Sequence, residues 1–298
     1  MSTPVDYSHL EPAVFGGIAS ASLDQARVVL LPIPLDRTTS FVPGTRHGPR
    51  EILNASIQTE LWDEELQFDV SSVPVATLPE MDLPFADQAR SIAEIERVAR
   101  AIVERDKFLI VLGGEHSVTP PVVKAVAGSY PGVSVLQIDA HADLRDTYLG
   151  SPHSHACAMR RTLEFARTTQ VAIRSMSRAE AQDAPGLKTS IFFDVSMRRD
   201  PAWIDRVVET LAETVYITID CDGLDPAIMP AVGTPEPGGL SWPELLALLR
   251  ATFAGRRVVG CDVVELCPIP GMVAPNLLAA RLVYKLIAYH ATSARRPG

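Results

Sequence analysis

Short apolar runs alternate with longer amphipathic segments along most of the chain. A short apolar run is typical of a buried β-strand, and apolar residues at helical spacing are typical of a helix packed on a sheet. The apolar runs predict strands at residues 27–34, 73–78, 107–112, 133–138, 170–174, 190–193, 215–220 and 257–263. The amphipathic segments predict helices at residues 49–61, 87–105, from about 117, 154–167, 201–213, 242–253 and 274–289.

Strands that alternate with helices predict a parallel α/β sheet with helices on both faces. The chain has 298 residues, of which 47% are hydrophobic, so it can bury a large core. We find no linker, Gly/Ser run or internal repeat, and we therefore expect a single domain over residues 1–298. Residues 1–26 show neither the apolar runs typical of strands nor apolar residues at helical spacing. They are expected to form an irregular N-terminal arm, which could pack on a neighbouring subunit.

Three metal-ligand side chains follow the strand at residues 133–138, at alternate positions: Asp139, His141 and Asp143. Alternate residues of an extended chain point to the same side. Two carboxylates on one side repel each other unless a proton or a cation neutralises them, so the triplet indicates a divalent metal. A polar strand end satisfied by hydrogen bonds is the alternative interpretation.

Two further clusters lie at predicted strand ends. Asp220 and Asp222 repeat the alternate spacing, and His116 follows the pair Gly113-Gly114, where backbones can approach closely. The carboxyl ends of parallel strands share one edge, so these residues are expected to form one site. Taken singly, His116 could be a satisfied histidine near a turn, and Asp220 could be a cap.

Six candidate ligands exceed what one ion needs when water and substrate must also bind, and they suit two ions bridged by carboxylates. Carboxylate and imidazole ligands without thiolate favour Mn²⁺ over a structural Zn²⁺. Glu265 lies two residues beyond the last predicted strand, as either a carboxylate at the rim of the core or a substrate anchor.

Charge and composition narrow the classes of partner. The formal net charge of -9 argues against nucleic acid or an anionic membrane as partner, and it is compatible with a small cationic substrate or with ordinary solubility. The sequence shows no signal peptide and no apolar stretch of membrane-spanning length. The four cysteines lack CxxC spacing, which favours a reduced, cytoplasmic protein.

Three motifs together resemble the ureohydrolase family of arginase, agmatinase and their relatives: Gly-Gly-Glu-His-Ser from residue 113, Asp-Ala-His-Ala-Asp from 139 and Asp-Cys-Asp-Gly-Leu-Asp-Pro from 220. The resemblance spans Arg27 to Tyr289. It implies a three-layer α/β/α sandwich around an eight-stranded parallel sheet, a pair of Mn²⁺ ions, hydrolysis of a guanidinium group with release of urea, and a homo-oligomer, either a trimer or a hexamer.

The resemblance also implies a role for each site residue. One ion would be held by His116, Asp139, Asp143 and Asp220, and the other by Asp139, His141, Asp220 and Asp222. Asp143 would assist the attacking water and deliver a proton to the leaving amine. Glu265 matches the family's guanidinium-binding carboxylate, and His155 matches its proton-shuttle histidine, with His153 as the neighbouring alternative. Glu115 stands where the family commonly has Asp, and it is not expected to be a ligand.

The loops resemble agmatinase more than arginase. The segments 44–49 and 233–239 carry the resemblance, and Leu144-Arg145-Asp146 replaces the Asn-containing segment that receives the amino-acid head group in arginases. Arg145 and Asp146 are therefore candidate substrate-binding residues for a tail without an α-carboxylate. The expected reaction converts agmatine to putrescine and urea. Alternatives are N1-aminopropylagmatine, guanidinobutyrate, formimidoylglutamate or arginine as substrate, or a non-catalytic homologue that binds a small cation.

Overall fold

The computed structural model describes residues 14–84 and 87–293 of the chain. Eight strands form one sheet in the order β4-β1-β5-β10-β9-β6-β7-β8, and every neighbouring pair is parallel. Their bounds are β1 Val28–Ile33, β4 Val75–Thr77, β5 Phe108–Gly113, β6 Ser134–Ile138, β7 Arg167–Ile173, β8 Thr189–Phe193, β9 Thr214–Asp220 and β10 Arg257–Val264. The predicted eight-stranded parallel sheet is confirmed, with β4 at one edge.

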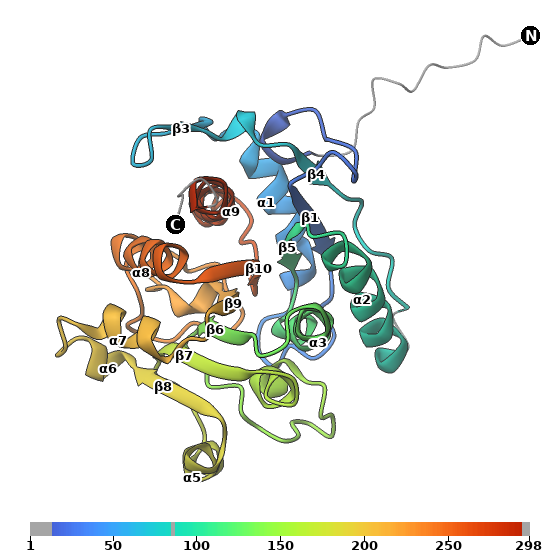
Figure 1. Ribbon diagram of the computed structural model, residues 1–298. Coiled ribbons are helices and arrows are strands. Elements are labelled where there is room, and N and C mark those ends of the chain that lie inside the picture. Colours follow the sequence, from blue (N-terminus) through green and yellow to red (C-terminus); the bar gives the residue numbers. More distant parts are fainter. Residues whose placement is uncertain (1–13, 85–86, 294–298) are drawn as a thin grey trace, which may run out of the picture.

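Helices cover both faces of the sheet, which gives the predicted three-layer sandwich (Figure 1). One layer contains α1 (Gly48–Ser56), α7 (Trp203–Thr210), α8 (Trp242–Gly255) and α9 (Ala274–Ser293). The other contains α2 (Gln88–Val103) and α3 (Thr119–Ser129), with α4 (Ala158–Thr162) against α3.

Successive side chains of a strand point to opposite faces of the sheet, so the core has two halves, one beneath each layer of helices. Leu30 and Ile110 belong to the core beneath α1, α8 and α9, whereas Val29 and Leu109 belong to the core beneath α2 and α3. All four residues are fully buried. Both faces of the sheet must therefore be apolar, which explains why the strands read as continuous apolar runs rather than as alternating ones.

Helix ends were predicted less well than strands. The predicted helix at 154–167 is a 3₁₀ turn (His155–Cys157) followed by α4, and β7 already begins at Arg167, where it pairs with Ser134. The predicted helix at 49–61 ends at Ser56. The sequence analysis did not predict the antiparallel pair β2 (Trp62–Asp63) and β3 (Phe68–Asp69), or the short helices α5 (Arg178–Asp183) and α6 (Asp194–Met197).

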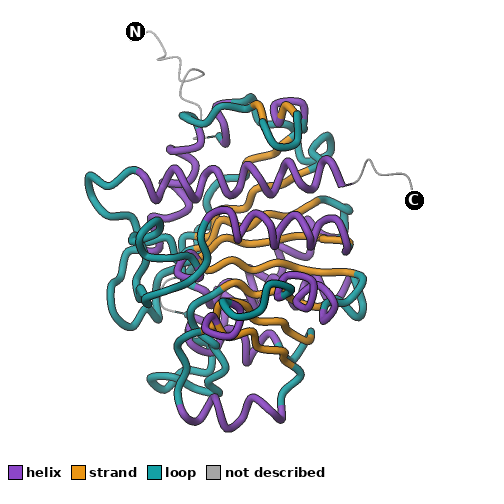
Figure 2. The backbone as a smooth tube through the Cα atoms, turned by 90° about the vertical axis from the view of Figure 1, so that its left-hand side faces the viewer, coloured by secondary structure: helices purple, strands orange, loops and turns teal. Residues whose placement is uncertain are grey.

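The predicted N-terminal arm lies partly outside the described residues, which begin at 14. Within its described part, Phe15 starts a 3₁₀ turn, and its side chain is buried in the core beneath α1. The longer loops gather at the edge of the sheet from which α9 starts (Figure 2). No helix in the described ranges is long and apolar enough to cross a membrane.

Candidate active site

Four adjacent strands deliver the predicted site residues to the carboxyl edge of the sheet. In the order β5-β10-β9-β6, these strands end next to His116, Glu265, Asp220 and Asp139, respectively. Because the carboxyl ends of parallel strands lie side by side, residues far apart in sequence meet there. The sequence-based prediction of one shared site at this edge agrees with the observed topology.

The Gly-Gly turn after β5 brings His116 against the end of β10. A Cβ atom at Gly114 would lie 1.9 Å from the carbonyl oxygen of Leu35, so only glycine fits at this close approach. The Glu265 amide donates a hydrogen bond to the Gly114 carbonyl at 2.8 Å. In return, the His116 amide donates to the side chain of Glu265, at Oε1 and 2.7 Å, so two hydrogen bonds hold the end of β10 against the Gly-Gly turn.

A first group of ligand atoms surrounds the imidazole of His116. Its Nδ1 lies 3.1 Å from Asp139 Oδ2, 3.2 Å from Asp143 Oδ2 and 3.3 Å from Asp220 Oδ2. All four side chains are buried, yet Nδ1 has no hydrogen-bond partner among the described residues. A nitrogen without a partner that faces three carboxylate oxygens fits a cation at their common centre.

A second group shares Asp139 with the first. His141 Nδ1 lies 2.9 Å from Asp222 Oδ2 and 3.7 Å from Asp139 Oδ1. Asp139 thus offers one carboxylate oxygen to each group. Within each group the candidate ligand atoms of His116, Asp139 and Asp220, or of Asp139, His141 and Asp222, lie within 4.8 Å of one another. This arrangement fits two adjacent cations bridged by a carboxylate.

The crowded carboxylates perturb one another. Burial raises the pKa of Asp220 well above its ordinary value, and repulsion from Asp222 and Asp139 adds to the effect. The pKa of Asp143 is also raised, by burial and by Asp139. For His141 burial opposes protonation, but Asp222 and Asp139 outweigh it and raise the pKa to about 12. The cluster therefore retains protons unless a cation replaces them.

A hydrogen-bonded chain behind His116 fixes its orientation. His116 Nε2 lies 2.9 Å from Thr218 Oγ1, which in turn donates to Asp262 Oδ1 at 2.5 Å. Tyr216 donates to Asp262 Oδ2 at 2.8 Å. Since the proton of Thr218 goes to the carboxylate, Thr218 accepts from His116 Nε2–H, and Nδ1 keeps a lone pair for a cation.

Two site residues have unusual backbone conformations. Asp143 has a φ of 53° and Glu265 a φ of 63°, in the left-handed region that residues with a Cβ atom rarely adopt. At Asp143 the conformation is held on both sides, because Leu144 N–H donates to Glu180 Oε1 at 3.0 Å and the Asp143 carbonyl accepts from Arg160 N–H at 3.0 Å. Such strain clusters at functional sites.

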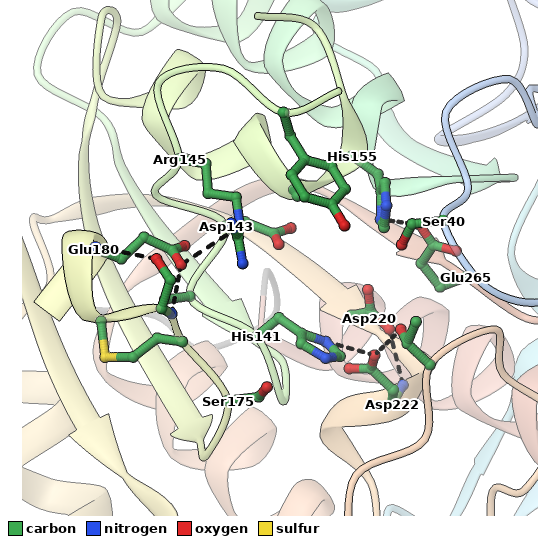
Figure 3. Close-up of a pocket in the computed structure, with 16 residues that line it drawn as sticks. Ser40, His141, Asp143, Arg145, His155, Ser175, Glu180, Asp220, Asp222 and Glu265 are labelled. Carbon is green, nitrogen blue, oxygen red and sulfur yellow. Dashed lines mark hydrogen bonds and ion pairs between the residues drawn. The ribbon is translucent and has the colours of Figure 1, made fainter. Parts of the chain in front are cut away.

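The ligand groups open into a cavity of about 280 Å³. Figure 3 shows Glu265, His155 and Ser40 on one side of it and Arg145 with Glu180 on the opposite side. The lining contains one arginine and five carboxylates, Asp143, Glu180, Asp220, Asp222 and Glu265. This balance of charge suits a cationic ligand.

Of the remaining predicted residues, two line this cavity and two do not. His155 lines it, with Nδ1 3.8 Å from Glu265 Oε1, whereas the exposed His153 lines a separate cavity beside α2 and α3. Arg145 lines the cavity with its guanidinium 4.8 Å from the ring centre of Tyr148. Asp146 is not among the lining residues, and its carboxylate instead pairs with Arg161 at 2.6 Å.

Several residues that support the site were missed by the sequence analysis. Gln137 Nε2 donates to Asp139 Oδ2 at 2.7 Å, and Gln170 Nε2 donates to the Ala142 carbonyl at 2.6 Å. Arg174 donates to the backbone carbonyl of Asp222 at 2.6 Å and to that of Pro237 at 3.0 Å. A glutamine at the same register in adjacent apolar strands was the available signal for the first pair.

Comparison with known proteins agrees with this geometry. The arginase family model matches residues 26–288, which is most of the chain. The chain belongs to the arginase family. The predicted ureohydrolase class and the prediction of a hydrolytic enzyme are thereby confirmed.

Individual relatives cover nearly the whole chain. The N(1)-aminopropylagmatine ureohydrolase of Synechocystis sp. is 40% identical over 295 residues, with 93% of this chain and 94% of the relative covered. The agmatinase of Bacillus cereus is 36% identical over 254 residues, with 83% and 86% covered. The crystal structure of the agmatine ureohydrolase of Thermoplasma volcanium matches with a TM-score of 0.86 at 33% identity, covering 95% of this chain and 96% of that chain.

Proposed function

We propose that the protein hydrolyses the guanidinium group of agmatine to give putrescine and urea. The observation that carries the proposal is the meeting of six ligand side chains with Glu265 at one cavity. The six are His116, Asp139, His141, Asp143, Asp220 and Asp222. The complete ligand set and the cavity beside it argue against a non-catalytic homologue that only binds a cation.

The ligand set supports two Mn²⁺ ions as the cofactor, because it consists of carboxylates and imidazoles without thiolate. When bound, the two ions supply activation of a water molecule near neutral pH and electrostatic stabilisation of developing charge. The shared carboxylate of Asp139 and the lone pair of His116 Nδ1 are the features of this chain that favour a pair of ions.

The protein's own groups then bind the substrate and move protons. Of the described residues, only the His116 amide hydrogen-bonds the Glu265 carboxylate, so Glu265 Oε2 can accept N–H groups of the guanidinium. Asp143 orients the attacking water and passes its proton to the leaving amine. His155, on the Glu265 side of the cavity, exchanges the other protons of the reaction with solvent.

A second candidate substrate is N1-aminopropylagmatine. The 40% identity to an N(1)-aminopropylagmatine ureohydrolase over nearly the whole chain favours it. Both substrates present the same guanidinium to Glu265 and differ only in the length and charge of the amine tail. Arg145, whose guanidinium lies 3.7 Å from Glu180 and over Tyr148, stands on the side of the cavity that such a tail would reach.

Release of urea, or of formamide from formimidoylglutamate, distinguishes the candidates. The purified protein loaded with Mn²⁺ is given agmatine, N1-aminopropylagmatine, arginine, guanidinobutyrate and formimidoylglutamate in parallel. We expect the highest kcat/KM with agmatine. A higher value with the aminopropyl derivative replaces the first candidate by the second, and turnover of arginine without turnover of either amine overturns both. Light scattering of the same samples tests the trimer or hexamer that we also propose.

The Asp143→Asn variant tests the assigned proton transfer. We expect kcat to fall by about a hundredfold or more, because general acid–base groups typically contribute that much. Circular dichroism should show an intact fold, and Mn²⁺ content is measured alongside. Retention of wild-type kcat with full metal content would remove Asp143 from the mechanism.

A further inference from the structure

Glu115 is fully buried behind the cavity and does not belong to either ligand group. Its carboxylate accepts hydrogen bonds from Arg37 N–H at 2.7 Å, Thr38 N–H at 2.5 Å, the Thr38 hydroxyl at 2.9 Å and the Ser117 hydroxyl at 2.5 Å. Three of these four donors lie in the loop after β1. Glu115 therefore fixes this loop to the turn that carries His116.

Thr38 continues the connection to the other side of the cavity. While its hydroxyl donates to Glu115, the same oxygen accepts the backbone N–H of His155 at 2.9 Å. The imidazole of His155 has only an edge-on contact with the Tyr148 ring, at a centroid distance of 6.4 Å, and its Nε2 is buried without a hydrogen-bond partner among the described residues. Its Nδ1 is 3.8 Å from Glu265 Oε1, which is beyond hydrogen-bond distance. The position of the ring thus depends strongly on the position of its backbone.

We propose that Thr38, held by Glu115, is a positioning residue that sets the place of His155 beside Glu265. The inference rests on the proposed function, because it assigns the effect of Thr38 to the proton exchange made by His155. It adds a residue that belongs to neither metal ligand group and is not itself among the residues that line the cavity. Ser40, two residues further along the loop, lines the cavity.

A matched control is available in the same loop. Thr39 donates its hydroxyl to Asp36 Oδ1 at 2.9 Å, and Asp36 also accepts the Gly44 amide at 2.7 Å. Within the described part of the chain, this second anchor makes no hydrogen bond to His155 or Glu115, and it holds the far part of the loop. Thr39→Val removes a hydroxyl of the same kind, at a similar depth, without changing the link to His155.

The test compares Thr38→Val, Thr38→Ser and Thr39→Val. The valine variant keeps the shape and the backbone bond from residue 38 to Glu115, but it leaves the His155 amide without its acceptor. Misplacing a catalytic group can lower the rate roughly a hundredfold. Thr38→Val should show part of this loss, and we expect kcat to fall about tenfold. Thr38→Ser retains the hydroxyl and should stay within about twofold of wild type, as should Thr39→Val.

A double-mutant cycle separates positioning from general weakening of the fold. In a His155→Asn background, Thr38→Val should change kcat by less than about twofold, because the group that it positions has been removed. A merely structural role predicts the same factor in both backgrounds. An unchanged kcat in Thr38→Val, or an equal loss in both backgrounds, overturns the proposal.

A readout that does not need turnover keeps the two proposals apart. Crystal structures of wild type and Thr38→Val, both grown with Mn²⁺, are compared at His155. A displaced His155 with unchanged metal ligands supports the positioning role, and an unmoved His155 overturns it. If the wild-type protein releases urea from none of the substrates, the proposed function fails, and this structural comparison still decides the role of Thr38.

Discussion

At the scale of single residues, the carboxylate of Glu265 has unfavourable surroundings in the cavity. Burial raises its pKa well above the ordinary value, and repulsion from Glu115 adds to this. Its backbone is held in the left-handed region as well. An ionised carboxylate in these surroundings lowers the stability of the folded protein. The need to bind a cation explains why the carboxylate is there.

The Glu265→Gln variant tests this trade between function and stability. A hydrogen bond to a charged group contributes about 1.5–3 kcal/mol, so kcat/KM for the guanidino substrate should fall roughly tenfold to a hundredfold. The metal-free variant should melt at a higher temperature than metal-free wild type, because a carboxyl with a raised pKa costs stability at neutral pH, either as a buried charge or through the proton that it takes up, and this cost is gone. Steady-state kinetics and calorimetric melting measure the two effects. An unchanged kcat/KM would contradict the role of Glu265 in binding the substrate.

The sequence was most informative at residues whose side chains are improbable at strand ends. Asp139, His141, Asp220 and Asp222 stand out there because the alternate spacing of ligand side chains occurs at two separate strand ends. Thr218 gave no such signal, since threonine is common in strands. It lies two residues before Asp220, on the same side of β9, and its importance depends on Asp262 from β10, a pairing that only the fold reveals.

At the scale of secondary-structure elements, β9 and β10 cooperate to orient His116 through the pair Thr218–Asp262. In Asp262→Asn, an amide N–H facing Thr218 would reverse its hydroxyl, which would then donate to His116 Nε2. The proton of His116 would move to Nδ1, the atom needed as a ligand. We expect Mn²⁺ affinity to fall about tenfold to a hundredfold, as is typical for such supporting groups.

Titration calorimetry with Mn²⁺ measures this effect. Thr119→Val is the matched control, because Thr119 donates to the other oxygen of Asp262 at 3.1 Å. Its loss should change the affinity by less than about threefold. Equal affinities in Asp262→Asn and wild type would show that the tautomer of His116 is set by another group.

Strands were predicted better than helices for a physical reason. Burial on both faces of the sheet makes each strand an apolar run with clear ends. The sequence pattern of a surface helix continues into the following loop, so it does not mark where the helix ends. The segment 154–167 shows the difference, because its apolar residues reach β7 without a break and hide the end of α4 at Thr162. Where a helix has a chemically marked start the prediction succeeds: α8 begins at Trp242, the predicted position, and Ser241 and Glu244 form a capping box there.

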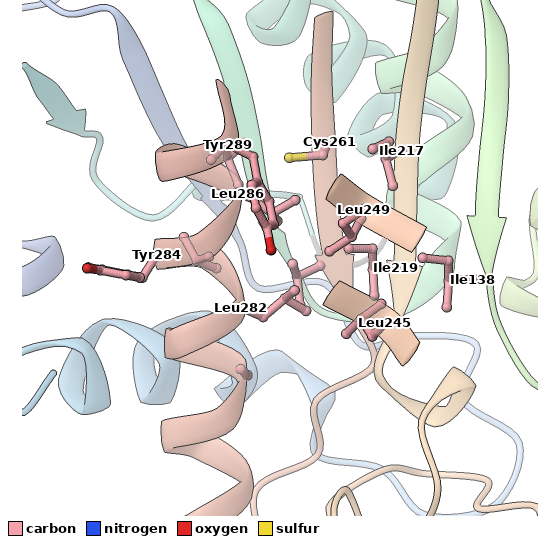
Figure 4. Packing of buried hydrophobic residues seen from close by; sticks show 14 of the residues in the cluster. Ile138, Ile217, Ile219, Leu245, Leu249, Cys261, Leu282, Tyr284, Leu286 and Tyr289 are labelled. Carbon is pink, nitrogen blue, oxygen red and sulfur yellow. The ribbon is translucent and has the colours of Figure 1, made fainter. Parts of the chain in front are cut away.

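The core beneath α8 and α9 supports the strands that carry the ligands. Figure 4 shows Leu249 of α8 facing Ile217 and Ile219 of β9, and all three side chains are fully buried. Leu249→Ala should lower the free energy of unfolding by about 2–5 kcal/mol. The matched variant Leu277→Ala, at a position that is 41% exposed, should cost less than about 1 kcal/mol. Urea denaturation measures both, and equal losses would contradict the assigned packing.

At the scale of the whole molecule, the two edges of the sheet have opposite electrostatic character. The acidic cavity lies at the carboxyl edge, where the strands end. At the amino edge, where the strands begin, a second cavity is lined by Arg27, Lys107, Arg257 and His290, and Asp106 is its acidic residue. The net charge of -9 is therefore unevenly distributed. Composition was compatible with a cationic ligand at the acidic edge or with ordinary solubility, and it could not predict this separation, which depends on the order of strands in the sheet.

The amino edge makes stability depend on pH independently of the metal ligands. The ring of His290 stacks on Phe108 with centroids 3.9 Å apart. Burial, and then repulsion from Arg27, lower its pKa from 6.5 to about 4. The unfolded chain thus binds this proton more readily than the folded one, so the contribution of His290 is fully present above about pH 6.5 and is lost as the pH falls towards about 4.

His290→Phe preserves the stacked ring and removes the titrating group. Between pH 7 and pH 4.5 the wild type should lose on the order of 2 kcal/mol more unfolding free energy than the variant, after allowance for partial solvent access. Denaturant titrations of both proteins across this range, with the metal state kept the same, give the difference directly. Because protonation of the metal ligands affects both proteins alike, it cancels in the comparison. Parallel pH profiles would mean that His290 is protonated in the folded protein, with Asp106 at the same cavity outweighing its burial and Arg27.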